Sequence, residues 1–161
     1  MIDIDITGGS KLQRSHVERA ARFYLTLLLG DPQNILLTIR LKPDLFQKYG
    51  SKADCLPLDE DDDFREYEIR VDCSMHLPAV LRCLAHEVVH VCQYHRGHMK
   101  DSPDGAYEII WKRKKWDIRT THYYDLPWEV EAYGHEVGLF ERYVTTRRLT
   151  GKRWYKDYDF V

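Results

Sequence analysis

One long apolar stretch constrains the fold of this chain more than any other feature: residues 77–94, LPAVLRCLAHEVVHVCQY. At about 100° per residue, its apolar side chains cover most of the surface of a helix. The positions that remain form a single polar stripe: Arg82, His86, Glu87, His90 and Gln93. Polar groups on an otherwise buried helix need partners, because burying them unpaired costs free energy. The stretch therefore predicts a central helix whose polar stripe meets a ligand.

Within this stretch, His86, Glu87 and His90 have the spacing HExxH. On a helix the two histidines point about 40° apart, so that both imidazoles can reach one metal ion. Glu87 points about 100° away from His86, where its carboxylate can take a proton from a metal-bound water. We therefore interpret His86 and His90 as metal ligands and Glu87 as a general base. The alternative, two core histidines satisfied by hydrogen bonds, accounts less well for the rest of the polar stripe.

A catalytic zinc site has three protein ligands and one open position, so that a third ligand must come from elsewhere in the chain. Residues 125–133, DLPWEVEAY, predict a second helix with Asp125 as its N-cap. On that helix Glu129 and Glu131 point about 160° apart. We expect Glu129 to face the HExxH helix and Glu131 to be solvated. Ala132, one turn later, leaves room for the two helices to approach closely.

The two motifs together resemble the gluzincin pattern, in which HExxH on one helix is followed by the glutamate of an ExxA-type motif on the next. The chain is most similar to small SprT-like or phage-type metallopeptidase domains, over residues 77–143. The resemblance implies one Zn²⁺ per chain, with His86, His90 and Glu129 as ligands. It also implies that Glu87 is the general base of peptide-bond hydrolysis.

The chain departs from these families in two respects. Where families with an ExxAD motif have an aspartate, this chain has Tyr133, and Glu136 one turn later is the candidate replacement. SprT-type DNA-repair proteases often carry a cysteine zinc ribbon, but this chain has no CxxC pair. Its cysteines are therefore expected to be thiols: Cys55, Cys73, Cys83 and Cys92.

Tyr123 and Tyr124 precede the second helix, at a place where hydrolases of this kind can keep a donor for the tetrahedral oxyanion. We treat both as candidate catalytic residues. Aromatic packing is the alternative for each.

The pattern around these motifs predicts one α+β domain over residues 1–161, with a motif core at 77–143 and a flexible tail at 150–161. The resemblance implies a zincin-like arrangement: a small antiparallel or mixed sheet packed on the HExxH helix and on a C-terminal third-ligand helix. We expect a helix at 15–29, strands at 34–42, 53–58 and 65–73, and a hairpin of 107–111 with 115–118. By the same resemblance, 67–72 is expected to be the sheet edge that pairs with an extended substrate.

The net charge and the hydropathy of the chain indicate which kinds of partner to expect. A net charge of -2 and a pI of about 6.4 disfavour a protein that mainly grips nucleic acid. We find neither a long apolar span nor an N-terminal secretory pattern, so that we expect a cytoplasmic protein with a peptide or protein substrate and no membrane partner. Two alternatives stay open: a zinc-stabilised binding or regulatory module without turnover, and a SprT-like protease that acts on DNA-bound proteins.

Overall fold

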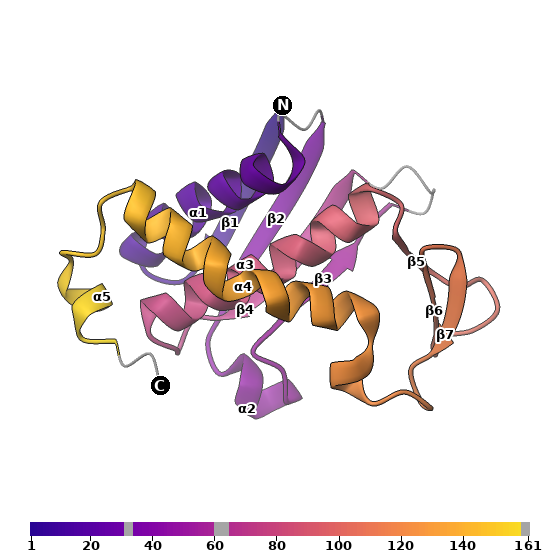
Figure 1. The fold of residues 1–161 in the computed structure, drawn as a ribbon. Helices are drawn as coiled ribbons and strands as arrows, with labels where there is room; N and C mark the ends of the chain where they lie inside the picture. Colours follow the sequence, from indigo (N-terminus) through magenta and orange to yellow (C-terminus); the bar gives the residue numbers. More distant parts are fainter. Residues whose placement is uncertain (31–33, 60–64, 159–161) are drawn as a thin grey trace.

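A computed structural model describes residues 1–30, 34–59 and 65–158 of the chain, and Figure 1 shows their arrangement. The elements are, in chain order, β1 (Ile2–Gly8), α1 (Lys11–Leu29), β2 (Ile35–Lys42), α2 (Leu45–Tyr49), β3 (Ala53–Pro57), β4 (Glu66–Asp72), α3 (Leu77–His95), β5 (Met99–Asp101), β6 (Glu108–Trp111), β7 (Lys114–Asp117), the 3₁₀ turn η1 (Tyr123–Asp125), α4 (Pro127–Thr146) and α5 (Arg153–Lys156). This content confirms the expected α+β class. No helix among the described residues is long and apolar enough to cross a membrane.

The main sheet has four strands in the order β1-β2-β4-β3. β1, β2 and β4 are parallel to one another, whereas β3 pairs antiparallel with β4, so that the sheet is mixed. Burial alternates along β2, with Ile35, Leu37 and Ile39 inside and Leu36 and Arg40 outside. Helices α1 and α3 cover the face of the sheet on which these buried side chains lie, and α4 packs across the two helices (Figure 1).

The prediction that residues 67–72 form an edge strand of the sheet was wrong. Strand β4 lies between β2 and β3 and is paired on both sides, from Leu36↔Glu66 on one flank to Cys55↔Ile69 on the other. A central position suits this strand because the side chains of Tyr67, Ile69 and Val71 are fully buried. The edges of the sheet are β1 and β3, and β3 packs against α3.

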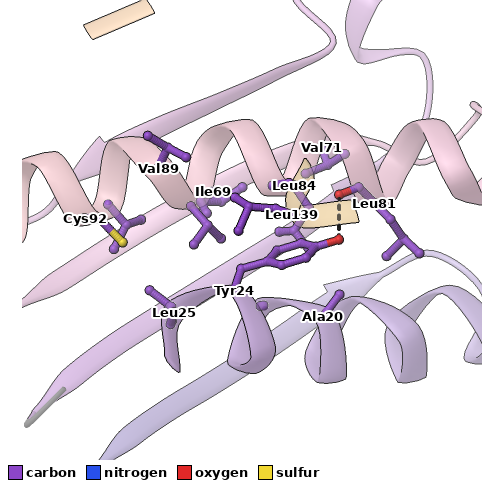
Figure 2. Packing of buried hydrophobic residues seen from close by; sticks show 14 of the residues in the cluster. Ala20, Tyr24, Leu25, Ile69, Val71, Leu81, Leu84, Val89, Cys92 and Leu139 are labelled. Atoms are coloured by element: carbon purple, nitrogen blue, oxygen red, sulfur yellow. Dashed lines mark hydrogen bonds between the residues drawn. The ribbon is translucent and has the colours of Figure 1, made fainter. Parts of the chain in front are cut away.

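Helix α3 is buried in the core, as its apolar stretch predicted. Leu81 and Leu84 are fully buried against Ile69 of β4, with Leu139 of α4 packed in the same cluster (Figure 2). The hydroxyl of Tyr24 in α1 donates to the carbonyl of Leu81 at 3.3 Å (Figure 2). Each such buried apolar side chain contributes roughly 1.5–3 kcal/mol. This packing fixes the polar stripe of α3 relative to the neighbouring helices.

Helix α1 begins four residues before the expected start, because of a capping box. The Ser10 hydroxyl accepts the Gln13 backbone N–H at 3.2 Å, and the Gln13 side chain accepts the Ser10 N–H at 2.8 Å. Gly8 lets the chain turn into this cap with φ +78°, and a Cβ there would lie only 2.0 Å from the carbonyl oxygen of Leu41. Gly30 ends the helix where the sequence predicted.

The predicted hairpin is present, and β5 extends it to a second sheet of order β5-β6-β7. Its turn residues, Lys112 and Arg113, both have positive φ. Trp111 and Trp116 pack against Trp128 at the start of α4, with ring centroids 6.3 and 6.5 Å apart, so that the small sheet is attached to the helix that carries the predicted third ligand.

Part of the tail that we expected to be flexible forms the short helix α5. There Trp154 packs edge-on against His16 of α1, with ring centroids 5.1 Å apart. Residues 159–161 of that expectation lie outside the described part of the chain.

Candidate metal centre

The structure brings together the three predicted metal ligands. His86 and His90 lie on adjacent turns of α3, and Glu129 lies in the first turn of α4. The Nε2 atom of His86 is 3.2 Å from that of His90, and the Glu129 carboxylate lies 3.1 Å from the first and 3.5 Å from the second. All three residues are buried, each with 6–7% of its surface exposed. Among the described residues, this is the group of histidine and acidic side chains whose geometry could hold a metal ion.

The close approach of α4 to α3 depends on the beginning of α4. Ala132 is fully buried one turn after Glu129, where a larger side chain would push the two helices apart. The N-cap is Leu126 and not Asp125, because backbone hydrogen bonds close residues 122–125 into the 3₁₀ turn η1. Leu126 is buried, so that apolar packing and not a side-chain cap fixes the start of the helix.

The outer nitrogen of His86 bonds to a carboxylate. Its Nδ1 lies 3.2 Å from Oε2 of Glu136. The other oxygen of Glu136, Oε1, forms an ion pair with Arg82 at 3.0 Å. Glu136 therefore lies in the position expected for a carboxylate that replaces the one missing at Tyr133. A carboxylate there orients the ring and makes Nε2 a better donor to a metal.

The outer nitrogen of His90 bonds to an amide. Its Nδ1 lies 2.8 Å from Oε1 of Gln93, whose Nε2 donates to the Trp128 carbonyl at 3.0 Å and to Glu131 at 2.9 Å. The Trp128 carbonyl and the Glu131 carboxylate are acceptors, so that only the amide nitrogen of Gln93 can bond to them. The amide oxygen Oε1 therefore faces His90, and Nδ1 of His90 carries the hydrogen of that bond. The Nε2 lone pair then points into the centre.

Two features of this contact were not predicted. Glu131 was expected to be solvated, but it is half-buried, because its carboxylate folds back to the amide of Gln93. Gln93 belonged to the polar stripe but was not assigned a role. The signal was its position three residues after His90, on the same helix face.

The centre attracts positive charge. Burial lowers the pKa of His86, but the hydrogen bonds to Glu129 and Glu136 outweigh it and raise the value to about 9. Burial raises the pKa of Glu129, but its bonds from His86 and His90 bring the value down to about 2. The hydrogen bonds among these residues thus favour positive charge at the centre, which a bound metal ion would supply.

Glu87 lies beside this centre without being bound into it. None of the hydrogen bonds within the described part of the chain uses its carboxyl, although only 6% of the residue is exposed. Burial raises the pKa of Glu87 to about 7, opposed by the attraction of His90 and His86. A carboxyl with a pKa near neutrality can both take and return a proton.

The two tyrosines take different positions. The Tyr123 hydroxyl donates to Oε2 of Glu129 at 2.7 Å, directly beside the ligands, and burial together with this bond raises its pKa. Tyr124 is 61% exposed, and its ring centroid lies 5.4 Å from that of Tyr133. Tyr123 therefore touches the centre, whereas Tyr124 lies at the mouth of the adjoining cavity.

Two cavities meet at Glu87 and Tyr123. The larger, about 740 Å³, extends past His86, and the smaller, about 250 Å³, extends past His90. Ala53 at the start of β3 lines both, so that the cleft follows the free edge of the main sheet. All four cysteines are free thiols, as expected.

Comparisons with protein-family models, with curated proteins and with solved structures give no match to this chain.

Proposed function

We propose that this protein is a zincin-like metallopeptidase, which hydrolyses peptide bonds with one Zn²⁺ held by His86, His90 and Glu129. The observation that carries the proposal is the meeting of these three donors beside the unbound carboxyl of Glu87, at the junction of two cavities. A site of three protein ligands and one open position is the arrangement of catalytic zinc.

The distances between the donors support zinc. Ligand atoms about 2.0–2.2 Å from a tetrahedral ion lie roughly 3.3–3.6 Å from one another. The separations of His86 Nε2 from His90 Nε2 and from Glu129 Oε2, 3.2 and 3.1 Å, are close to this range. His90 Nε2 lies 3.5 Å from the other oxygen of Glu129, and one ligand atom of each residue lies within 4.8 Å of the other two. The outer bonds of both imidazoles, to Glu136 and Gln93, fix the rings with Nε2 turned inward.

The residues around the centre have separable roles in this proposal. Bound zinc supplies Lewis acidity, which makes water more acidic and polarises the scissile carbonyl. Glu87 takes the proton of the attacking water and delivers it to the leaving amine. Tyr123 is the nearer candidate to donate a hydrogen bond to the developing oxyanion, for which its hydroxyl would turn away from Glu129. The edge of β3 offers backbone groups to an extended peptide.

The open cleft favours hydrolysis over the zinc-stabilised binding module. A metal that only stabilises the fold has no use for a buried carboxyl such as Glu87, which lines both cavities. For a protease dedicated to DNA-bound proteins, the net charge of -2 gives no support.

Metal analysis combined with digestion of a proteome-derived peptide library tests the proposal. Wild type and Glu87→Gln should each contain about one Zn²⁺, and only wild type should cleave. Glu18→Gln, on the exposed side of α1, is the matched control and should cleave like wild type. Equal cleavage by the Glu87→Gln protein would overturn the proposal, and so would purified protein that binds no zinc.

A further inference from the structure

The larger cavity has aromatic walls. Tyr124 lies 5.3 Å from Tyr123 and 5.4 Å from Tyr133 between ring centroids, and the three rings form one wall. Phe46 of α2 also lines the cavity and is 51% exposed. An exposed aromatic surface inside a cavity is typical of a site that binds an apolar group.

Two of the residues that α3 contributes to the same cavity have small side chains. Ala79 and Cys83 lie one helical turn apart on α3, directly before the turn that carries His86 and Glu87. Small side chains leave room there, and the volume of this cavity, about 740 Å³, exceeds the volume of about 250 Å³ on the other side of Glu87. The cleft can therefore accept a bulky side chain on one side of the reacting carbonyl and a smaller one on the other.

One cation of the larger cavity has no acidic partner among the described residues. Arg82 is paired with Glu136, which also bonds His86. Lys52 lines the same cavity, is exposed, and takes part in no ion pair among the described residues. Its ammonium lies 5.9 Å from the centroid of the Phe46 ring. The ammonium group of Lys52 is therefore available to form an ion pair with a carboxylate of a substrate.

We propose that the cleft selects polypeptides with a bulky aromatic residue next to the scissile bond, on the side of the larger cavity, and an acidic residue close to it. The smaller cavity accepts a small side chain on the other side of the bond. This inference rests on the proposed peptidase function and names its substrate class.

Cleavage of a peptide library by wild-type protein is the first test. Aromatic residues should be enriched on one side of the cleaved bond and small residues on the other. A wild-type profile without a side-chain preference, or with preference for small or basic residues on both sides, would overturn the inference and leave the proposed function standing.

The second test is a substitution that reduces the volume of the larger cavity. Ala79→Phe should reduce cleavage of peptides with an aromatic residue by about 10- to 100-fold relative to peptides with an alanine there, the usual range for apolar pockets. Ala79→Leu should give the same direction with a smaller effect and serves if the larger substitution prevents folding. Val137→Phe, on an exposed position of α4, is the matched control. An unchanged ratio of aromatic to alanine cleavage in Ala79→Leu would contradict the assignment of the cavity.

The charge is tested by Lys52→Glu, with Lys48→Glu on the exposed surface of α2 as control. Lys52→Glu should lose the preference for a nearby acidic residue by about two- to fivefold, the size of an exposed ion pair. The Lys48 variant should keep it. Equal profiles of both variants would remove Lys52 from the inference.

Binding measurements test the preference of the larger cavity separately from peptidase activity. Aromatic and alanine-containing peptides are titrated into the Glu87→Gln protein and followed by fluorescence anisotropy. Tighter binding of the aromatic peptides, reduced by Ala79→Leu, supports the cavity even if no peptide is ever cleaved. Equal binding of both peptides counts against the cavity, whatever the outcome for peptidase activity.

Discussion

The Nδ1 atom of His90 lies 2.8 Å from Oε1 of Gln93, and this contact determines which nitrogen of the ring faces the metal centre. The amide cannot turn round, because its nitrogen is already committed to the Trp128 carbonyl and to Glu131. A neutral residue of α3 thus performs for His90 what the carboxylate of Glu136 performs for His86. Glu136 belongs to α4, and Gln93 is held by residues of α4, so that the packing of the two helices also sets the orientation of the rings.

Replacing Gln93 by methionine tests this role. The side chain keeps its length but loses the acceptor for His90, so that zinc affinity should fall by about 10- to 100-fold, as is typical for lost outer-shell partners. Competition with a chromophoric chelator measures it. Gln47→Met, at an exposed position of α2, is the control. Unchanged zinc affinity in Gln93→Met would mean that packing alone orients His90.

The two glutamates of α4 should respond differently to truncation. Glu129→Ala removes a proposed ligand and should abolish most zinc binding. Glu131→Ala only releases one of the two bonds that hold Gln93, so that its effect on zinc affinity should be clearly smaller. Zinc content of the purified variants distinguishes them. A larger loss in Glu131→Ala would contradict the assignment of the third ligand.

Tyr123→Phe separates a catalytic role from a structural one. The change removes the hydroxyl that lies 2.7 Å from Glu129, and we expect zinc to remain bound while kcat falls by roughly 10²-fold, as for a lost oxyanion donor. Tyr124→Phe, in the exposed wall, should change kcat much less. If Tyr123→Phe lost zinc instead, the hydroxyl would serve mainly to hold Glu129.

Local sequence predicted the parts of the site that depend on a single helix. The HExxH spacing placed His86 and His90 on one face of α3, and helical geometry turned Glu129 toward them, although it did not foresee that Glu131 also reaches α3. These predictions work because side-chain directions on a helix follow from residue number alone.

The features that were missed depend on contacts distant in the chain. The central position of β4 results from pairing with β2 and β3, which no local pattern specifies. The bond from Gln93 to Glu131 joins residues on two helices whose packing has to be known first. Strand β1 is different, because residues 2–6, IDIDI, alternate as a strand should and were considered only as a possible signal segment.

The hairpin turn offers a prediction independent of the metal. Lys112 and Arg113 have φ of 45° and 71°, a backbone region that side chains with a Cβ rarely adopt and that favours glycine in tight hairpin turns. Arg113→Gly should therefore stabilise the fold by about 0.5–1 kcal/mol in urea unfolding. Arg113→Ala removes the same charge but keeps the unfavourable backbone and should not stabilise. Equal gains in both variants would point to charge repulsion in the turn.

Asp72 should make the stability of the fold depend on pH. The residue is 4% exposed, and its carboxylate accepts the backbone N–H groups of Phe46 and Ser74, each at 2.9 Å. Burial alone raises the pKa of Asp72, but these hydrogen bonds outweigh it and hold the pKa below its usual value. The ionised form thus stabilises the connection to α2, whose Phe46 lines the larger cavity.

The direction of the pH effect follows from this lowered pKa. The stabilisation is complete above the pKa of the unfolded chain, about 3.9, and is lost as the pH falls through the lower pKa of the folded protein. Asp72→Asn puts an amide nitrogen against a backbone donor and should cost roughly 1–3 kcal/mol of unfolding free energy at neutral pH. The difference from wild type in urea unfolding should shrink below about pH 4. Asp5→Asn, exposed on β1, is the control, and a difference for Asp72→Asn that stays constant down to acidic pH would show that shape and not ionisation supports this connection.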